Sequence, residues 1–228
     1  MLPGLEAGDH LLVNKLAYRT SAPRRGEAIL LRREVEGELR EIIKRVIGLP
    51  GDRVRMEGPH PVINGWSIPS CDLGPYTYVQ DGVQLVGHAS VEFLGDSEYL
   101  VASTLGQSAP AVEFVVGEGE VFVLGDNRSG SQDSRSWRGE RGGGVPFSAI
   151  DGRVSKTLVG MTRRGEPDFS QLFLPPADFN LHGFDVRPLE SALEGCRAER
   201  PKDANPPAPS RRAPGPTTVS LTLPGKTN

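Results

Sequence analysis

Basic residues are not in excess in this sequence, and long apolar runs are missing. The 26 lysines and arginines are outnumbered by 29 aspartates and glutamates, so the net charge is -3. This balance argues against a nucleic-acid-binding protein, because such proteins usually carry a basic surplus. No stretch approaches the roughly 20 apolar residues of a membrane span, and no signal-peptide core opens the sequence. The sequence as printed therefore predicts no membrane anchor.

Cysteine is also scarce. Cys71 and Cys196 are the only two, which is too few for a disulfide framework or a cysteine-rich zinc site. We favour the interpretation that they are two unrelated thiols. The alternative is a single disulfide, which would form in an oxidising compartment.

Glycine and proline, by contrast, are frequent, with 28 and 20 copies, whereas aromatic residues make up only 6%. This composition favours short strands joined by turns over long helices. Asn64-Gly65 is a strong two-residue hairpin turn, because both residues tolerate positive φ. Short apolar segments predict strands at 10–18, 27–31, 39–47, 62–68, 98–102, 111–116, 120–124 and 152–159. Their number and spacing predict a mainly β fold of the antiparallel sandwich or barrel type.

The composition divides the chain into three parts. Residues 1–160 are predicted to form the β domain, and residues 161–200 an extension of uncertain structure. Seven prolines fall within residues 201–228, where arginine, serine and threonine fill much of the rest. Such a segment cannot bury enough apolar area to offset its chain entropy. We therefore predict a disordered C-terminal tail from residue 201 onward.

A lysine inside an apolar strand is the first feature that suggests chemistry. Residues 42–52 read IIKRVIGLPGD, and neighbouring side chains of a strand point to opposite faces, so Lys44 and Arg45 cannot both face the core. Burying an ammonium group is costly, so a lysine in this position reaches solvent, pairs with an acid or loses its proton. A solvated lysine at a sheet edge is the simplest alternative.

A polar loop directly after an apolar strand is the second such feature. Residues 125–135 read GDNRSGSQDSR and follow the apolar run 121–124. A loop placed on a rigid strand can aim its side chains at a site. Asp133 and Arg135 can form a charge-assisted pair, and Ser131 supplies a hydroxyl in the same loop. A well-capped surface turn is the alternative.

Together the two segments resemble the signature boxes of the bacterial type I signal peptidases. Residues 44–52 match the family pattern without a departure, whereas Ser129 and Gly130 stand where the family more often has aspartate and asparagine. Residues 1–15 resemble the opening box, with Gly4 in place of threonine. Residues 145–146 and 150–153 resemble the closing box, and residues 138–144 are an insertion. The resemblance covers roughly residues 1–155.

This resemblance implies the signal peptidase fold and a serine–lysine endopeptidase without a cofactor or a metal ion. Lys44 is then the general base, Ser131 orients the lysine, and Asp133 and Arg135 support the loop. Residues implied to bind substrate are Met1, Pro3, Ile42 and Ile43. The implied partners are signal peptides of exported preproteins and, for the full-length form, the membrane surface, with no role for nucleic acid. The implied location is the plasma (inner) membrane, with the catalytic domain on the extracytoplasmic side and no anchor in the chain as given.

The position of Met1 matters for this interpretation. In the family the nucleophilic serine directly precedes the methionine that aligns with Met1, and a membrane helix lies upstream. Ser21 does not have a matching context. We expect a start assigned too late, so that these 228 residues form an inactive piece of the peptidase. The alternative is a non-catalytic, peptide-binding member of the fold. A self-cleaving repressor with the same chemistry would need a DNA-binding domain, which the sequence does not indicate.

Overall fold

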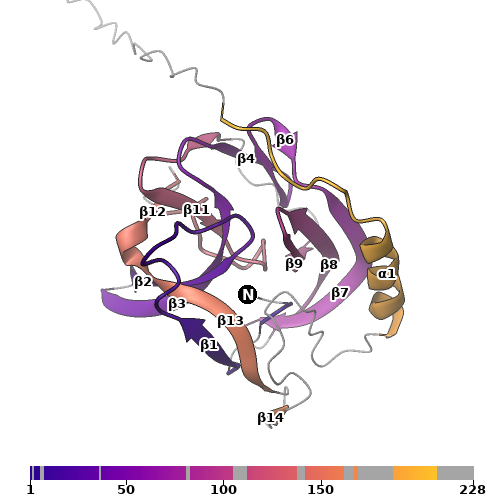
Figure 1. Ribbon diagram of the computed structural model, residues 1–228. Coiled ribbons are helices and arrows are strands. Elements are labelled where there is room, and N and C mark those ends of the chain that lie inside the picture. Colours follow the sequence, from indigo (N-terminus) through magenta and orange to yellow (C-terminus); the bar gives the residue numbers. More distant parts are fainter. Residues whose placement is uncertain are drawn as a thin grey trace, which may run out of the picture.

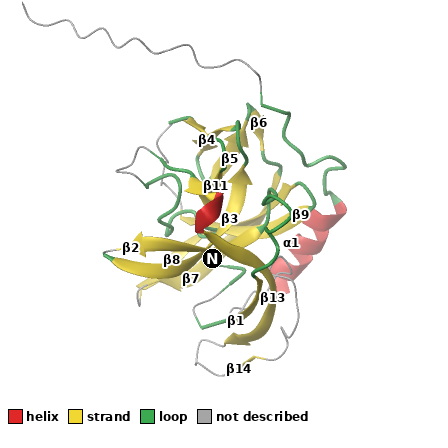
Figure 2. Cartoon of the chain, turned by 60° about the vertical axis from the view of Figure 1, so that its left-hand side comes forward, coloured by secondary structure: helices red, strands yellow, loops and turns green. Residues whose placement is uncertain are grey.

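The computed structural model describes residues 1, 3–5, 8–35, 37–80, 83–104, 112–137, 142–161, 167–168 and 187–209. Strands dominate these residues, and neighbouring strands within each sheet run antiparallel. The predicted mainly β fold is therefore confirmed. The strands form three sheets that curl around a common interior (Figures 1 and 2).

The large sheet carries the lysine strand. Its strands are β1 (His10–Asn14), β2 (Ala28–Val35), β3 (Glu38–Gly48), β11 (Glu120–Leu124), β12 (Val145–Pro146), β13 (Ile150–Met161) and β14 (Pro167–Asp168). Their order is β1-β13-β2-β3-β11-β12, and β14 pairs with β13. A short 3-10 helix, η1 (Phe147–Ala149), connects β12 to β13. The central place of β3 puts the end of the lysine strand next to β11 and the polar loop that follows it.

Two smaller sheets complete the body. The four-stranded sheet has the order β10-β4-β5-β6 and consists of β10 (Phe114–Val115), β4 (Arg53–Glu57), β5 (His60–Ile63) and β6 (Trp66–Ser67). The three-stranded sheet consists of β7 (Ser70–Gln80), β8 (Val83–Leu94) and β9 (Ser97–Thr104). Asn64 and Gly65 join β5 to β6 with φ angles of 54° and 81°. The predicted hairpin turn is therefore confirmed.

The apolar interior is shared among the sheets. Fully buried side chains from β3, β5, β8, β9 and β11 meet in one cluster: Ile47, Ile63, Leu94, Tyr99 and Leu124. Burial of this kind stabilises by about 1.5–3 kcal/mol for each large apolar side chain. Because the large sheet and the three-stranded sheet share this cluster, the positions of β3, β9 and β11 depend on one another.

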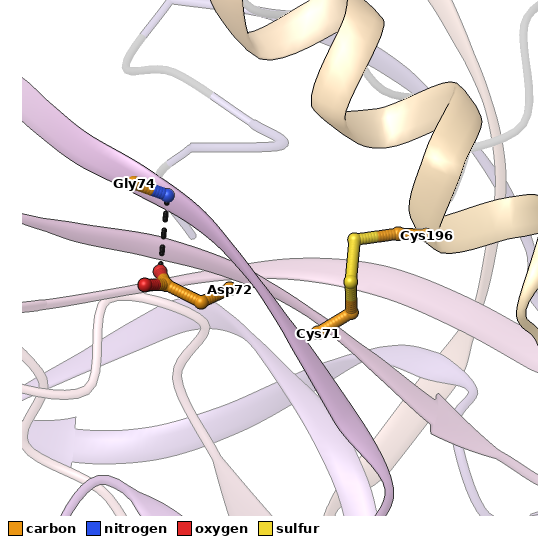
Figure 3. Close-up of a disulfide and its surroundings, with 4 residues drawn as sticks. All are labelled: Cys71, Asp72, Gly74 and Cys196. Atoms are coloured by element: carbon orange, nitrogen blue, oxygen red, sulfur yellow. Dashed lines mark hydrogen bonds between the residues drawn. A yellow bond between two sulfur atoms is a disulfide. The ribbon is translucent and has the colours of Figure 1, made fainter.

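A disulfide links the C-terminal part of the chain to this body. Cys196, on helix α1 (Arg187–Ala198), is bonded to Cys71 on β7, as Figure 3 shows. The two residues are 125 positions apart. Our interpretation of unrelated thiols is therefore wrong. Sequence spacing could not reveal the pair, because α1 lies beside β7 through tertiary packing, which includes that of Leu193 and Cys196 against the three-stranded sheet.

The segment after α1 also differs from our prediction of disorder. Residues 199–209 run from α1 along the body toward β6 (Figure 1). Gly95 donates a backbone hydrogen bond to the carbonyl of Ala204 at 2.8 Å, and Ala204 is buried. Asn64 donates its side-chain amide to the carbonyl of Pro207, also at 2.8 Å. Residues 201–209 are thus held by backbone and side-chain contacts that composition does not reveal, while residues 210–228 lie outside the described residues.

We predict that the disulfide makes a large contribution to stability. Replacing Cys71 and Cys196 together by serine should lower the free energy of unfolding by about 2–4 kcal/mol, since the bond closes a long loop of the unfolded chain. Chemical denaturation of the oxidised protein and the double variant measures this difference. Addition of a reducing agent should lower the free energy of unfolding of the wild type alone. An equal decrease in the double variant would contradict the prediction.

Among the residues that the structure describes, no helix is long and apolar enough to cross a membrane.

Candidate active site

The lysine of the apolar strand and the serine of the polar loop meet in the structure. Lys44 Nζ donates a hydrogen bond to Ser131 Oγ at 2.8 Å, although the residues are 87 positions apart. Lys44 lies on β3, where it pairs with Ile29 of β2, and Ser131 lies in the loop that follows β11. The solvated edge lysine is thereby excluded, and the proximity that we expected is confirmed. The roles of the two groups in catalysis stay a prediction.

Arg45 points to the other face of β3, as strand alternation requires. It is 3% exposed and donates to both carboxylate oxygens of Asp126, at 2.8 and 2.6 Å. A third bond, from Nη1, reaches the carbonyl of Gly26 at 2.8 Å, and the guanidinium lies over the ring of Tyr99 at 4.1 Å. Since Asp126 belongs to the polar loop, this buried pair fixes the loop to β3 directly beside Lys44.

Asp133 anchors the same loop from within. Its carboxylate is fully buried, accepts the backbone N–H of Gly125 at 3.0 Å, and is held by Arg135 through Nε at 2.7 Å and Nη2 at 2.8 Å. Burial raises the pKa of Asp133, but the hydrogen bonds and charge of Arg135, with the bonds from Gly125 and Ser131, outweigh it and lower the pKa. The predicted Asp133–Arg135 pair is confirmed, and it carries the loop segment that contains Ser131.

Gly125 leaves the space in which Lys44 and Ser131 meet. A Cβ atom at this position would lie 2.2 Å from Ser131 Oγ and 3.3 Å from Lys44 Nζ. Such a contact with the serine is sterically impossible without a shift of the loop. Sequence reasoning gave no role to Gly125, Arg45 or Asp126. The only signal was their place inside the two segments 42–52 and 125–135.

We predict that Gly125→Ala separates Lys44 from Ser131. The added methyl group should displace the loop and lower the free energy of unfolding by about 1–3 kcal/mol, a change that thermal and chemical denaturation measure. Gly195→Ala is the matched control, because nothing lies within 4 Å of that Cβ position and alanine favours a helix over glycine. The control should be neutral or stabilising. Equal stability of both variants would contradict the steric argument.

The electrostatic environment of Lys44 favours its neutral form. Burial lowers the pKa of the Lys44 amine, and the charge of Arg135 lowers it further. Asp133 and Asp126 act in the opposite direction, but the pKa still lies below the ordinary value for lysine. A buried amine can therefore exist without its proton at a pH where solvent-exposed lysines are charged, as a general base requires.

The amino group of Met1 lies in the same environment. Burial lowers the pKa of this group, and the charges of Lys44 and Arg45 lower it further, whereas the charge of Asp126 acts in the opposite direction. The N-terminus lies near the middle of the molecule (Figures 1 and 2), and Pro3 and Leu5 are buried. The carbonyl carbon of any residue that precedes Met1 would therefore be attached to a nitrogen atom on which the charge of Lys44 acts.

The remaining predicted substrate-binding residues lie on the lysine strand. Ile42 and Ile43 are both half-buried and point to opposite faces of β3, so only Ile42 shares the face of Lys44. All of β2 pairs with residues 38–45 of β3, whereas β11 pairs only with residues 45–48 of β3. In the described part of the chain, no strand pairs with the other side of residues 38–44. Binding of substrate by Met1, Pro3, Ile42 and Ile43 stays a prediction.

The fold and the site define a class of protein. A partly buried lysine amine that is bonded to a serine hydroxyl and has a lowered pKa has the properties of a general base. Residues 1–159 match the family described as "Signal peptidase, peptidase S26". The chain belongs to this family.

Individual relatives agree with the family assignment. Signal peptidase I of Pseudomonas aeruginosa is 31% identical over 176 residues, which cover 71% of this chain and 56% of that protein. Signal peptidase I of Bacillus caldolyticus is 33% identical over 154 residues, 68% of this chain and 71% of the relative. The protein of the same name from Leptolyngbya laminosa is 33% identical over 172 residues, 73% of this chain and 68% of the relative. The chain thus spans little more than half the length of the Pseudomonas relative.

Proposed function

We propose that this chain is the catalytic part of an endopeptidase that removes signal peptides from exported preproteins. The observation that carries the proposal is the position of the Lys44 amine, which is bonded to Ser131 and lies within electrostatic range of the Met1 nitrogen. A base held at this point can serve a nucleophile attached directly to Met1. In the family, the nucleophilic serine occupies that position.

The proposed mechanism is a serine–lysine dyad. The neutral Lys44 amine takes the proton from the serine hydroxyl, and the serine oxygen forms a bond to the carbonyl carbon at the cleavage site. The peptide C–N bond then breaks, and the lysine ammonium returns the proton to the leaving amine. Water, deprotonated by the same lysine, hydrolyses the acyl-enzyme ester and releases the signal peptide. No metal ion or cofactor takes part in these steps.

The other site residues orient the base in this proposal. Ser131 holds the Lys44 amine in one rotamer through its 2.8 Å hydrogen bond. Asp133 and Arg135 keep Ser131 in place through their ion pair, and the Asp133 carboxylate also accepts a hydrogen bond from the backbone N–H of Gly125. Such positioning contributes to rate because the reacting atoms must be aligned before the proton moves.

The open side of β3 fits an extended peptide substrate. Residues 38–44 have no strand partner there among the described residues, so a peptide can add to the sheet through backbone hydrogen bonds. Met1, Pro3, Ile42 and Ile43 would then line shallow apolar pockets for the small side chains before the cleavage site. Signal peptides carry such small residues in an Ala-x-Ala pattern.

The proposed location is the extracytoplasmic side of the plasma membrane, where the full-length form would meet preproteins at the membrane surface. The disulfide between Cys71 and Cys196 supports an oxidising compartment, since cytosolic thiols are usually kept reduced.

A cleavage assay tests the proposed function. The enzyme is an extended form, in which a serine directly precedes Met1 and an apolar span precedes that serine. A purified preprotein with an Ala-x-Ala site should be cut once, after the second alanine, and mass spectrometry of the products identifies the bond. Binding of the preprotein without any cleavage would favour the non-catalytic, peptide-binding alternative.

We predict that Ser131→Ala slows the extended form without abolishing turnover. The alanine removes the hydrogen bond that orients the Lys44 amine but leaves the base itself, so kcat should fall by about 10- to 100-fold. Initial rates at saturating preprotein measure this change. Ser148→Ala is the control, because Ser148 is exposed in η1, and it should cleave like the parent. Unchanged kcat in the Ser131 variant would contradict its orienting role.

A further inference from the structure

A fully buried ion pair joins the three-stranded sheet to the loop that carries Ser131. Glu92 lies on β8 and Arg128 lies in the loop, and both side chains are inaccessible or nearly so, with 0% and 1% exposure. Arg128 Nη1 donates to Glu92 Oε1 at 2.9 Å, and Nη2 donates to Oε2 at 2.6 Å. Paired hydrogen bonds of this kind fix orientation as well as distance.

Glu92 is the acid that neutralises Arg128. Among the described residues, the one further hydrogen-bond partner of the guanidinium is the carbonyl of Pro59, which accepts from Nη1 at 2.7 Å. Arg128 Nε is buried without a hydrogen-bond partner among the described residues. His60 Nδ1 lies 3.1 Å from Glu92 Oε1 and ties the carboxylate to the β4–β5 hairpin. A buried arginine that loses its counter-ion is strongly destabilised, so the loop would shift to hydrate it.

Such a shift would pass directly to Lys44 through short contacts. The backbone carbonyl of Arg128 accepts a hydrogen bond from Arg135 Nη2 at 2.7 Å. Arg135 holds Asp133 at 2.7 Å, and Ser131, between these residues in the loop, holds the Lys44 amine at 2.8 Å. Arg128 therefore holds Arg135, which pairs with Asp133 within the loop. Glu92, on the three-stranded sheet, in turn holds Arg128.

We propose that Glu92 is a positioning residue for peptide cleavage, which holds the Ser131 loop against Lys44 through its buried pair with Arg128. Glu92 does not contact the reacting atoms and acts only through the loop. The inference rests on the proposed function for its effect on rate, but its effect on the Lys44–Ser131 geometry can be observed without any substrate.

The test compares two isosteric substitutions of buried carboxylates. Glu92→Gln removes the charge beside Arg128. Asp52→Asn removes an equally buried charge, which pairs with the partly exposed Arg25 at 2.6 Å. The other hydrogen-bond partners of the Asp52 carboxylate are the backbone N–H of Leu49 and the side-chain amide of Asn64, neither of which contacts Lys44 or Ser131 in the hydrogen bonds of the described residues. Both variants lose the charge of a buried carboxylate that is paired with an arginine, so both should be less stable. Only the Glu92 variant should alter the site.

The first readout is the titration of Lys44 in the 228-residue chain, observed by NMR with 13C at the lysine Cε. The chain has five lysines, so the spectrum is simple: Lys15, Lys44, Lys156, Lys202 and Lys226. If the loop moves away in Glu92→Gln, water reaches the amine and its pKa should rise toward the ordinary lysine value. In Asp52→Asn the Lys44 titration should match the wild type.

The second readout is cleavage by the extended form. Glu92→Gln should lower kcat by about 10- to 100-fold and leave KM within about twofold, since a displaced base affects the chemical step. Asp52→Asn should leave both constants unchanged. A wild-type Lys44 titration in Glu92→Gln, or an equal change in Asp52→Asn, would overturn the proposal. If the unsubstituted extended form cleaves nothing, the proposed function fails, and the Lys44 titration alone decides the role of Glu92.

A double variant separates positioning from stability and also serves if Glu92→Gln does not fold. Glu92→Leu with Arg128→Met replaces the ion pair by an apolar pair, which should restore the melting temperature because no unpaired charge remains. The pKa of Lys44 should remain above its wild-type value, because the paired hydrogen bonds that fix the loop are absent. Recovery of both stability and the wild-type Lys44 titration would show that Glu92 serves stability alone.

Discussion

Lys44→Ala in the extended form should abolish signal-peptide cleavage. The substitution removes the proposed base, and neither a neighbouring arginine nor water can replace a neutral amine at that position, so kcat/KM should fall by about 10⁴-fold or more. The rate of product formation from a purified preprotein measures the loss. The protein should still fold, because the substitution removes an amine whose burial is unfavourable.

The pH dependence of the unsubstituted extended form provides the control for this experiment. Lys44 acts without its proton, so kcat/KM should increase with pH and level off above the pKa of the lysine. Burial lowers that pKa, so the midpoint should lie below the ordinary value of about 10.4. Residual cleavage by Lys44→Ala with the same pH midpoint would show that another group is the base.

A polypeptide of these 228 residues that begins at Met1 should not cleave preproteins, whereas the extended form should. Without a hydroxyl group attached to Met1, the proposed nucleophile that Lys44 would deprotonate is missing, and the acyl-enzyme cannot form. The expected difference is the whole measurable activity. The assay compares the two polypeptides at equal concentration, with detergent present so that loss of the apolar span does not by itself separate enzyme from substrate.

Replacing the serine before Met1 by alanine in the extended form gives the matched control. This variant keeps the span and the peptide bond at Met1 but lacks the nucleophile, so it should be as inactive as the shorter polypeptide. Cleavage by the 228-residue chain at a rate near that of the extended form would contradict the mechanism and require a nucleophile within the printed sequence.

Several elements could be predicted from sequence because their signals are local. Residues 39–47 and 120–124 show dense apolar residues bounded by turn residues, and they form most of β3 and all of β11. The turn at Asn64 and Gly65 follows from the two residues themselves. In these segments the local pattern indicates the strand, although Leu39 is exposed and Arg45 is buried.

The long hairpin of β7 and β8 was not predicted. Its outer half extends into solvent, where Val83 and Val86 are 58% and 63% exposed, so apolar and polar residues do not alternate regularly. Helix α1 was also missed, since the described part of its buried face consists mainly of Leu193 and the bonded Cys196. Helix α1 is held by its disulfide to the distant strand β7, a contact that a local sequence pattern cannot contain.

The candidate site shows the same division. Lys44, Ser131, Asp133 and Arg135 could be named in advance because they stand in two motifs, and the structure brings them together. The support around them was not visible. The pairing of Glu92 with Arg128 depends on how β8 packs beneath the loop, and no motif marks Glu92 as different from any other acidic residue in a strand.

Covalent trapping shows whether a nucleophile attached to Met1 works with Lys44. The extended form is mixed with preprotein, quenched in acid within one turnover, and digested for mass spectrometry. We expect an ester between the serine before Met1 and the C-terminal end of the signal peptide, and we expect no such ester in the Lys44→Ala variant. An ester on Ser21, Ser131 or any other residue, or cleavage that persists when the serine before Met1 is alanine, would contradict the proposed mechanism.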